Sequence, residues 1–510
     1  MYPPPLSAVE PCIRNPILEG ADPWVIRYGD EYLWCFADGN RGVALHLGPN
    51  LHTPGVKRVV WTSPEAGPAS RELRAPEIHH IGGRWHIYFA ASDGDNRNHR
   101  AHVLVGEAED PFGLYELKGP LYTGDDRRLT DGNRWAIDFT IHEHAGRLYG
   151  FWSGWEAEED SQHLYAAPMA DPTTVSGPRV RLSDNAVYEW ERVEPGGRGL
   201  NEAPQPISHE GRLHLLFSAS ASWLPSYCVG RMELHGDDPL DASAWVKHPV
   251  PLLAPREDMP GVGHATAVRS PDGSQHWLVY HAKLDAVPGR ARVVSIQPFS
   301  WHRGRPVVGR ATAKVPCPRG SVTPDNRPDR RLDLSRPVAD MHFLGHHQLL
   351  EFADDGVRLG RTPSQPANLF RSGEKLLLTD PTPSDLSLVV EFTTAADQRD
   401  VGVLFRTTEP TIGYDSQRGY FAGIIPADRR LLIGCTDGST WRELASTHLD
   451  PAPDGRYRLE VVAVGDRLRA SVGDTSVEAW DRTHQTGMVG LRVVDAEALF
   501  QHLEYRPAGP

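Results

Sequence analysis

The feature that most constrains this chain is a short unit that recurs five times before residue 285. Each copy has a turn glycine followed by an apolar strand rich in aromatic and β-branched residues. Successive glycines are 54, 63, 65 and 62 residues apart, at Gly29, Gly83, Gly146, Gly211 and Gly273. A unit of this length has room for about four short strands, as in a propeller blade. Helical periodicity is almost absent, so the repeat predicts an all-β, five-bladed propeller.

A second repeat places one polar residue six to nine positions before each turn glycine. These residues are Asp22, Glu77, Asp138, Glu202 and His264. A shared register in every blade implies a shared place in space, which in a propeller is the innermost strand facing the central channel. The sequence therefore predicts that four carboxylates and one imidazole converge on the axis.

The repeat ends before a segment rich in proline and charge. We expect residues 1–316 to form the propeller and residues 317–333 to form a linker. Strand-like runs about ten residues apart fill residues 334–510, separated by turns such as Asp437-Gly438. This spacing predicts a β-sandwich of the jelly-roll kind. We expect the sandwich to lack the chemistry, because it holds no inward cluster of acids.

Charge and cysteine usage narrow the partners and the compartment. The chain has 53 Lys and Arg against 67 Asp and Glu, a net charge of −14 without a basic run, so nucleic acid and anionic membranes are unfavourable partners. No window reaches the ~20 apolar residues of a membrane span. The start lacks a secretory pattern, and the five cysteines (Cys12, Cys35, Cys228, Cys317 and Cys435) include no close pair. We expect free thiols and a cytoplasmic location.

Converging carboxylates repel one another and raise one another's pKa, so they need a chemical reason. Hydrolysis of a glycosidic bond requires a proton donor and a second carboxylate that activates water or attacks directly. A third acid can hold the donor's pKa high. Asp22, Asp138 and Glu202 fit this set. Glu77 is open to a structural reading, as an acceptor for backbone N–H groups, and His264 to packing, to orienting the acid or to binding a metal ion.

The motifs that carry these residues resemble glycoside hydrolase family 43, and within it the exo-acting α-L-arabinofuranosidases. The resemblance spans roughly residues 14–310. It rests on Gly20-Ala21-Asp22-Pro23, Ala75-Pro76-Glu77, Ile137-Asp138, Asn201-Glu202 and Gly263-His264, and is strengthened by Trp152-Ser153-Gly154-Trp155. The second domain resembles concanavalin-like or laminin-G-like sandwiches appended to such hydrolases.

The resemblance implies a five-bladed propeller that inverts the anomeric centre. It implies Asp22 as general base, Glu202 as general acid and Asp138 as the residue that tunes and orients that acid. Arg292 would contact the sugar. The chemistry would need no cofactor, but a structural calcium or sodium ion could lie on the axis near His264. The places of Asp22 and Glu202 on blades one and four also suit the wide carboxyl separation, about 6.5–9.5 Å, of an inverting enzyme.

Two departures from the family pattern affect the expected sugar. Arg74 stands where the family usually has Trp, and Phe139 stands where it has a small residue or Pro. Both flank the acids and could reshape the site for another pentofuranose or for a hexofuranose. The residues expected to bind substrate are Glu77, Arg74, Phe139, Trp155, His264 and Arg292. The prediction is therefore an inverting exo-hydrolase that removes terminal α-L-arabinofuranosyl units. The alternatives are a β-D-xylosidase, a galactofuranosidase, or a propeller that binds carbohydrate without catalysis.

Overall fold

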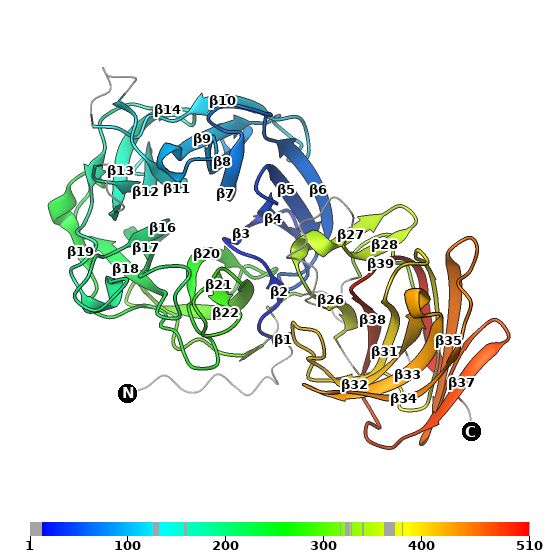
Figure 1. Ribbon diagram of the computed structural model, residues 1–510. Helices are drawn as coiled ribbons and strands as arrows, with labels where there is room; N and C mark the ends of the chain where they lie inside the picture. The colour runs from blue at the N-terminus through cyan, green and yellow to red at the C-terminus, as the bar shows by residue number, and fades with distance from the viewer. Residues whose placement is uncertain are drawn as a thin grey trace, which may run out of the picture. The chain divides into compact units, whose positions relative to one another are not determined.

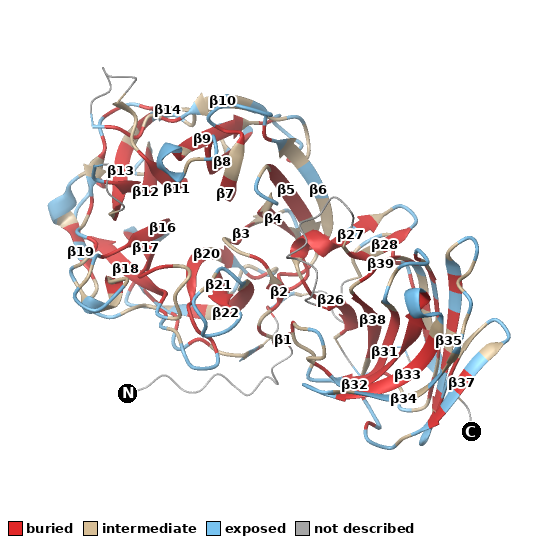
Figure 2. Cartoon of the chain, viewed as in Figure 1, coloured by how far each residue is buried: buried red, intermediate tan, exposed pale blue. Residues whose placement is uncertain are grey.

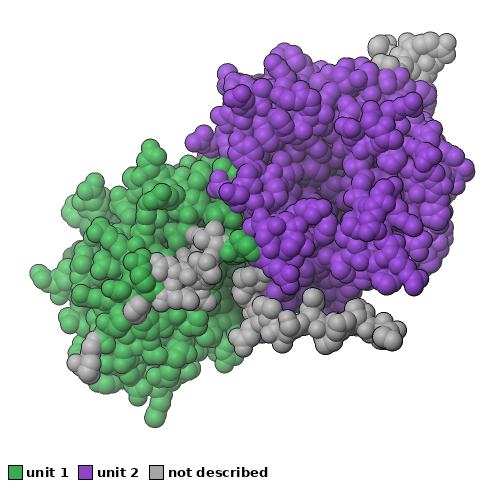
Figure 3. Space-filling view, turned by 180° about the vertical axis from the view of Figure 1, so that it is seen from behind, with its two compact units in different colours: residues 1–19, 47–57, 320–510 green, residues 20–46, 58–319 purple. Residues whose placement is uncertain are grey.

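The computed structural model describes residues 13–125, 132–157, 161–316, 318–321, 327, 329–338, 341–361, 373–379 and 381–508. The chain divides into two compact units (Figure 3). One comprises Gly20–His46 and Arg58–Arg319, and the other Met1–Glu19, Leu47–Lys57 and Gly320–Pro510. The domain boundaries expected at 316 and 334 stay a prediction. Cys12, Cys317 and residues 322–326 and 328 of the expected linker lie outside the described residues.

The first unit contains five antiparallel sheets, each running from an inner to an outer strand in chain order (Figure 1). Blade one holds β3 (Trp24–Tyr28), β4 (Glu31–Asp38), β5 (Gly42–Gly48) and β6 (Val56–Thr62). Blade two holds β7 (Arg71–Ile81), β8 (Arg84–Ser92), β9 (Arg100–Val105) and β10 (Glu116–Pro120). Blade three holds β11 (Ala136–His144), β12 (Arg147–Trp155) and β13 (Gln162–Asp171), on which β14 (Thr174–Val175) and β15 (Val180–Arg181) both pair.

Blades four and five repeat this arrangement. Blade four holds β16 (Asn201–His209), β17 (Arg212–Ala219), β18 (Cys228–Leu234) and β19 (Trp245–Lys247). Blade five holds β20 (Gly263–Arg269), β21 (His276–Lys283), β22 (Arg292–His302) and β23 (Arg305–Val307). The inner strands β3, β7, β11, β16 and β20 each contact the next, and β20 contacts β3. The ring is therefore closed, and the predicted five-bladed propeller is confirmed.

The turn glycines explain why the repeat was visible in the sequence. Each lies in the hairpin between a blade's first two strands, with φ between 59° and 76°. Residues with a Cβ rarely adopt this left-handed conformation, whereas glycine does so without strain. No atom lies within 4 Å of a Cβ built at any of the five, so backbone conformation, rather than space, requires glycine there. The glycines are Gly29, Gly83, Gly146, Gly211 and Gly273.

Neighbouring blades pack face to face through aromatic and aliphatic side chains. Between blades two and three, for example, Tyr88, Phe139, Trp152 and Tyr165 belong to one buried cluster. Figure 2 shows the inner strands of the propeller as largely buried. The described residues contain no α-helix, only short 3-10 turns, and no helix that could cross a membrane.

The second unit contains two antiparallel sheets around one hydrophobic core. In β35 buried and exposed positions alternate almost strictly, as expected of a strand with one face on a core and one in water. One sheet has the order β27-β28-β39-β30-β35-β36-β37 with β25 on β39, and the other β26-β29-β38-β31-β32-β33-β34. The predicted sandwich is confirmed.

The strands of the sandwich are β25 (Arg330–Leu332), β26 (Met341–Leu344), β27 (Leu350–Ala353), β28 (Gly356–Gly360), β29 (Glu374–Leu378), β30 (Leu386–Thr393), β31 (Asp400–Thr408), β32 (Arg418–Ile425), β33 (Arg430–Asp437), β34 (Trp441–His448), β35 (Arg456–Val464), β36 (Arg467–Val472), β37 (Thr475–Trp480), β38 (Met488–Val494) and β39 (Glu497–Pro507). The remaining strands of the described residues are β1 (Ile13–Arg14), β2 (Leu18–Glu19) and β24 (Lys314–Val315). Cys35, Cys228 and Cys435 are free and buried.

Candidate active site

A β-bulge interrupts the inner strand of blades two to five and turns side chains toward the axis. The pairing register shifts between Arg74 and Glu77, Ile137 and Thr140, Glu202 and Gln205, and Gly263 and Thr266. The first bulged residue in each has a positive φ: Ala75 45°, Asp138 54°, Ala203 51° and His264 49°. Asp22, just before β3, has the same conformation with φ 51°. Bulges and left-handed non-glycine residues both concentrate at active sites.

The bulges correct the shared register expected from the sequence. Asp22, Asp138 and His264 occupy the equivalent left-handed position. Glu202 lies one residue before the bulged Ala203, and Glu77 lies two residues after the bulged Ala75. Because side chains alternate along a strand, a window of six to nine residues before a turn is too wide to fix the face of the strand.

Asp22 is held by three side chains of blade five. Its Oδ1 accepts a hydrogen bond from Arg292 Nη1 at 3.0 Å, and it lies 3.2 Å from His281 Nδ1 and 3.4 Å from His264 Nδ1. Burial raises the pKa of Asp22, but the charge of Arg292, followed by the histidines, outweighs burial and holds the pKa well below its ordinary value. Asp22 is therefore a carboxylate near neutral pH, and its side chain remains 19% exposed.

Glu202 is more deeply buried, with 7% of its surface exposed. Its Oε1 accepts a hydrogen bond from the Tyr227 hydroxyl at 2.7 Å, and its Oε2 accepts one from Gln162 Nε2 at 3.1 Å. Burial raises the pKa of Glu202 above its ordinary value, although both hydrogen bonds oppose the rise. This carboxyl therefore keeps its proton to a higher pH than a solvated glutamate does.

Asp138 lies next to Glu202 and is also buried. Its Oδ2 accepts a hydrogen bond from the Ala203 N–H at 2.9 Å. Burial raises the pKa of Asp138 well above its ordinary value, and the charges of Glu202 and Asp22 raise it further. These mutual effects place the three acids within electrostatic reach of one another, so the predicted convergence of Asp22, Asp138 and Glu202 is present in the structure.

Tyr227 and His281 connect Glu202 with Asp22. Their rings stack with centroids 5.5 Å apart and planes 16° apart. Tyr227 binds Glu202, while His281 Nδ1 accepts the backbone N–H of Asp22 at 3.1 Å. Burial lowers the pKa of His281 to about 4, so it is neutral near pH 7.

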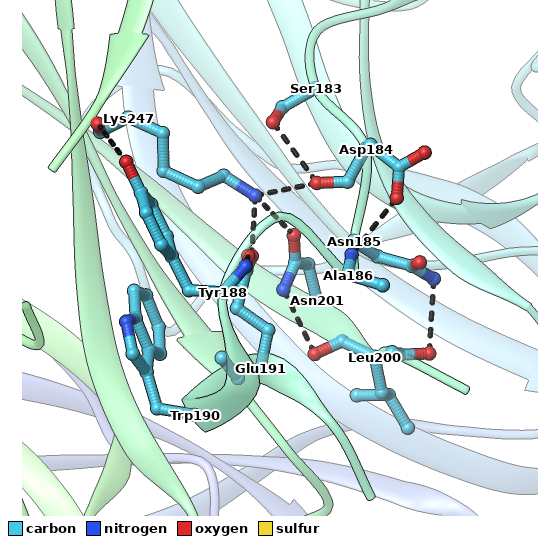
Figure 4. A network of polar contacts seen from close by, with 12 residues as sticks. Ser183, Asp184, Asn185, Ala186, Tyr188, Trp190, Glu191, Leu200, Asn201 and Lys247 are labelled. Carbon is cyan, nitrogen blue, oxygen red and sulfur yellow. Dashed lines mark hydrogen bonds and ion pairs between the residues drawn. The ribbon is translucent and has the colours of Figure 1, made fainter. Parts of the chain in front are cut away.

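A buried polar network supports the strand that presents Glu202 (Figure 4). Lys247 Nζ contacts the Glu191 carboxylate and donates hydrogen bonds to the Asp184 carbonyl at 2.7 Å and to Asn201 Oδ1 at 3.0 Å. Both partners of the ion pair are buried. Since Asn201 directly precedes Glu202, the network fixes the start of β16.

Phe139 and Trp155, both expected to bind substrate, are buried. Phe139 is fully buried and packs between Tyr88 and Trp152, with centroids 5.4 and 5.6 Å away. Because the bulge turns Asp138 toward the axis, the side chain of the next residue, Phe139, enters the core between blades two and three. The expected contact of Phe139 with the sugar is therefore wrong. Trp155 is 5% exposed and stacks on Trp135 at 4.5 Å, which covers one face of its ring.

Glu77 is buried, with its Oε2 3.3 Å from His79 Nε2. Burial raises the pKa of Glu77 well above its ordinary value and lowers that of His79 to about 3. The His79 ring is therefore neutral near pH 7, whereas the Glu77 carboxyl keeps its proton to a higher pH than a solvated glutamate does. Arg74, with a 34% exposed side chain, has Glu72 Oε1 at 3.4 Å.

The calcium or sodium ion expected near His264 stays a prediction. Over the described ranges, no group of three or more His, Cys, Asp or Glu side chains could hold a metal ion. His264 Nδ1 faces Asp22, and its backbone N–H donates to Ser218 Oγ at 2.7 Å. His264 is therefore a neighbour of Asp22 in this site.

Sequence reasoning missed Tyr227, His281, Gln162 and Arg290. None belongs to the repeat motif, and His281 contacts a residue 259 positions away. Arg290 had one available signal, its place two residues before Arg292. Side chains two apart in an extended segment share a side.

Comparison with known proteins agrees with this architecture. The model of the family described as Glycosyl hydrolases family 43 matches residues 13–306. An extracellular exo-alpha-(1->5)-L-arabinofuranosidase from Streptomyces chartreusis is 32% identical over 281 residues, covering 53% of this chain and 82% of that protein. Alpha-L-arabinofuranosidase 43 from Humicola insolens is 29% identical, covering 53% of this chain and 56% of its own length. This chain thus spans little more than half of that relative.

Among solved structures, an alpha-L-arabinofuranosidase from Lactobacillus brevis is 27% identical with a TM-score of 0.53. The alignment covers 60% of this chain and 97% of that one. The family match lies in the part of the chain that contains the five blades.

Proposed function

The chain belongs to glycosyl hydrolases family 43 and is a glycoside hydrolase, and on this premise we propose that it removes terminal α-L-arabinofuranosyl units from arabinose-containing glycans. The observation that carries the mechanism is the opposite pKa shift of two carboxyl groups. Arg292 holds the pKa of Asp22 well below its ordinary value, whereas burial raises the pKa of Glu202. At one pH the site therefore offers both a base and an acid.

In the proposed reaction Asp22 takes a proton from water while Glu202 gives its proton to the glycosidic oxygen. The water oxygen bonds to the anomeric carbon as the bond to the leaving oxygen breaks, so the product sugar carries the new hydroxyl and the leaving group departs neutral. Asp138, whose pKa burial raises well above its ordinary value, orients the neighbouring Glu202 and tunes its pKa. His264 and Arg292 hold Asp22 and border the sugar.

Direct attack by water from the side opposite the leaving group inverts the anomeric centre. Proton NMR of the first-formed sugar tests this step. We expect the β anomer to appear first from an α-arabinofuranoside. Initial formation of the α anomer would show that Asp22 acts as a nucleophile instead of a base.

The sugar itself is tested by hydrolysis of a panel of p-nitrophenyl glycosides. We expect the highest kcat/KM on the α-L-arabinofuranoside. A higher value on the β-D-xylopyranoside or on a galactofuranoside would select those alternatives, which use the same acids. No hydrolysis of any member, by a folded protein that binds the sugars, would support the non-catalytic alternative.

Substitution of the acids tests their roles. We expect Asp22→Asn, Asp138→Asn and Glu202→Gln each to lower kcat/KM by about 10²–10⁴-fold, the usual contribution of general acid–base catalysis. Glu65→Gln is the matched control, because Glu65 is highly exposed and its ion pair is with Arg41. Near-normal turnover by any of the three variants would remove that residue from the mechanism.

Two further expectations remain separate proposals. No step of the proposed reaction uses an axial ion. Metal analysis of the purified enzyme, before and after treatment with EDTA, tests whether calcium or sodium is bound near His264. The cytoplasmic location is tested by fractionation of cells that express the natural gene. The Streptomyces relative is named as extracellular.

A further inference from the structure

Three guanidinium groups lie around the acids, but only one has a clear ionic partner there. Arg292 forms the 3.0 Å pair with Asp22. Arg74 occupies in blade two the position that Glu202 occupies in blade four, directly before the bulged residue. The common register predicts that Arg74 and Glu202 point toward the same site.

Arg74 is only weakly neutralised. Its Nη2 lies 3.4 Å from Glu72 Oε1, a long contact, and Glu72 Oε2 also accepts a hydrogen bond from Ser92 at 3.0 Å. The side chains of Arg74 and Glu72 are 34% and 29% exposed. An ion pair of this kind contributes little, so Arg74 is available to a ligand.

Arg290 lies in the loop between β21 and β22, two residues before Arg292. Its guanidinium lies over the Trp223 ring, 5.6 Å from the centroid. The loop is fixed by the Gly289 N–H, which donates to the Trp223 carbonyl at 2.8 Å, and by Lys283 Nζ, which donates to the Gly289 carbonyl at 2.6 Å. Within the described residues, no carboxylate forms an ion pair with Arg290.

The arginines affect one another. Burial lowers the pKa of Arg290, as do the charges of Arg74 and Arg292, while Glu202 and Asp22 oppose the change. Arg290 is therefore close to the acids and to a second, weakly neutralised cation. Arg292 pairs with Asp22, and the pKa values of Glu202 and Asp138 are both raised, so Arg74 and Arg290 add positive charge to this side of the site on a chain whose net charge is −14.

We propose that Arg74 and Arg290, with the Trp223 ring, form a subsite for an anionic group carried by the sugar substrate, such as the carboxylate of a uronic acid next to the arabinofuranosyl unit. A guanidinium binds a carboxylate through two parallel hydrogen bonds, and the Trp223 ring beneath Arg290 holds that guanidinium in place. An anion between the two arginines would relieve their repulsion. This inference rests on the proposed function for the place of the arabinofuranosyl unit, while the anion site itself is independent of it.

The test is a calorimetric titration with methyl α-D-glucuronoside and, as the neutral match, methyl α-D-glucoside. We expect the glucuronoside to bind wild-type protein at least tenfold more tightly than the glucoside, and salt to weaken it. Arg74→Gln and Arg290→Gln should each reduce its affinity about tenfold, and the double variant should bind the two glycosides equally. Arg147→Gln, at the exposed β11–β12 turn, is the control and should bind as wild type.

A sulfated probe identifies the range of anions. Binding of galactose 6-sulfate with the same dependence on Arg74 and Arg290 would assign a general anion site, whereas its failure beside tight glucuronoside binding would assign a carboxylate site. Equal binding of glucuronoside and glucoside by wild type, or glucuronoside binding unchanged in the folded double variant, would overturn the proposal. Because the titration needs no turnover, its outcome is separate from whether arabinofuranosides are hydrolysed.

Discussion

Replacing Tyr227 with Phe should move one limb of the pH–activity profile and leave the other in place. The Tyr227 hydroxyl donates a 2.7 Å hydrogen bond to Glu202, which favours the ionised carboxylate. A net hydrogen bond to a charged group contributes about 1.5–3 kcal/mol, and one pKa unit corresponds to about 1.4 kcal/mol. Removing the hydroxyl should therefore raise the pKa of Glu202 by about 1–2 units.

The sign of the effect follows from the role of each acid. Glu202 must be protonated, so its pKa sets the alkaline limb of kcat/KM, which should move to higher pH. Asp22 must be ionised and sets the acid limb. The Tyr227 hydroxyl makes no hydrogen bond to Asp22, so that limb should stay. The phenyl ring retains the stack on His281.

The assay is kcat/KM on p-nitrophenyl α-L-arabinofuranoside across pH. Tyr32→Phe is the control, because it also removes a tyrosine hydroxyl, one that donates to the Arg269 carbonyl at 2.9 Å instead of to a candidate catalytic acid. An alkaline limb that stays in place or moves to lower pH, in a variant with wild-type melting temperature, would refute the assignment of Glu202 as the acid. Movement of the acid limb in place of the alkaline limb would refute it equally.

Three further outcomes test the surroundings of the site. Phe139→Leu should lower the melting temperature yet leave KM within about threefold of the wild-type value. A large rise in KM would show that Phe139 contacts the sugar. The pKa of Glu77 in the folded protein lies above its value in the unfolded chain, so its contribution to stability is present at low pH and is lost as pH rises. Glu77→Gln should therefore raise the melting temperature more at pH 8 than at pH 4. The control Glu65→Gln, at an exposed position, should show no such difference. Lys247→Met should lower the free energy of unfolding by about 3–5 kcal/mol, because it leaves Glu191 buried and unpaired. The double variant Lys247→Met/Glu191→Leu should recover part of this loss. Equal stability of the single and double variants would contradict this reasoning.

The fold was predictable because its signal is local and repeated. A turn glycine with positive φ leaves the same mark in every blade, so five copies reveal five blades. Asp22, Asp138 and Glu202 were accessible for a related reason: each stands in a short motif at an inner strand.

The partners of these acids could not be predicted in this way. Tyr227, Gln162 and His281 reach the acids through tertiary packing over sequence distances of 25, 40 and 259 residues, and no spacing rule relates them. The face of each inner strand was also ambiguous, since one bulged residue reverses the alternation. That single feature accounts for the error at Phe139, whose neighbour Asp138 takes the inward position.

The three contacts of Asp22 join the beginning of the propeller to its end. Asp22 precedes the first blade, while His264, His281 and Arg292 belong to the last, up to 270 residues later. A molecule in which these blades have parted keeps Glu202 and its partners in blades three and four, yet loses the guanidinium that keeps Asp22 ionised. Such a molecule has an acid without a base. Catalysis therefore requires the complete ring, and we expect a truncated or misassembled copy to be inactive.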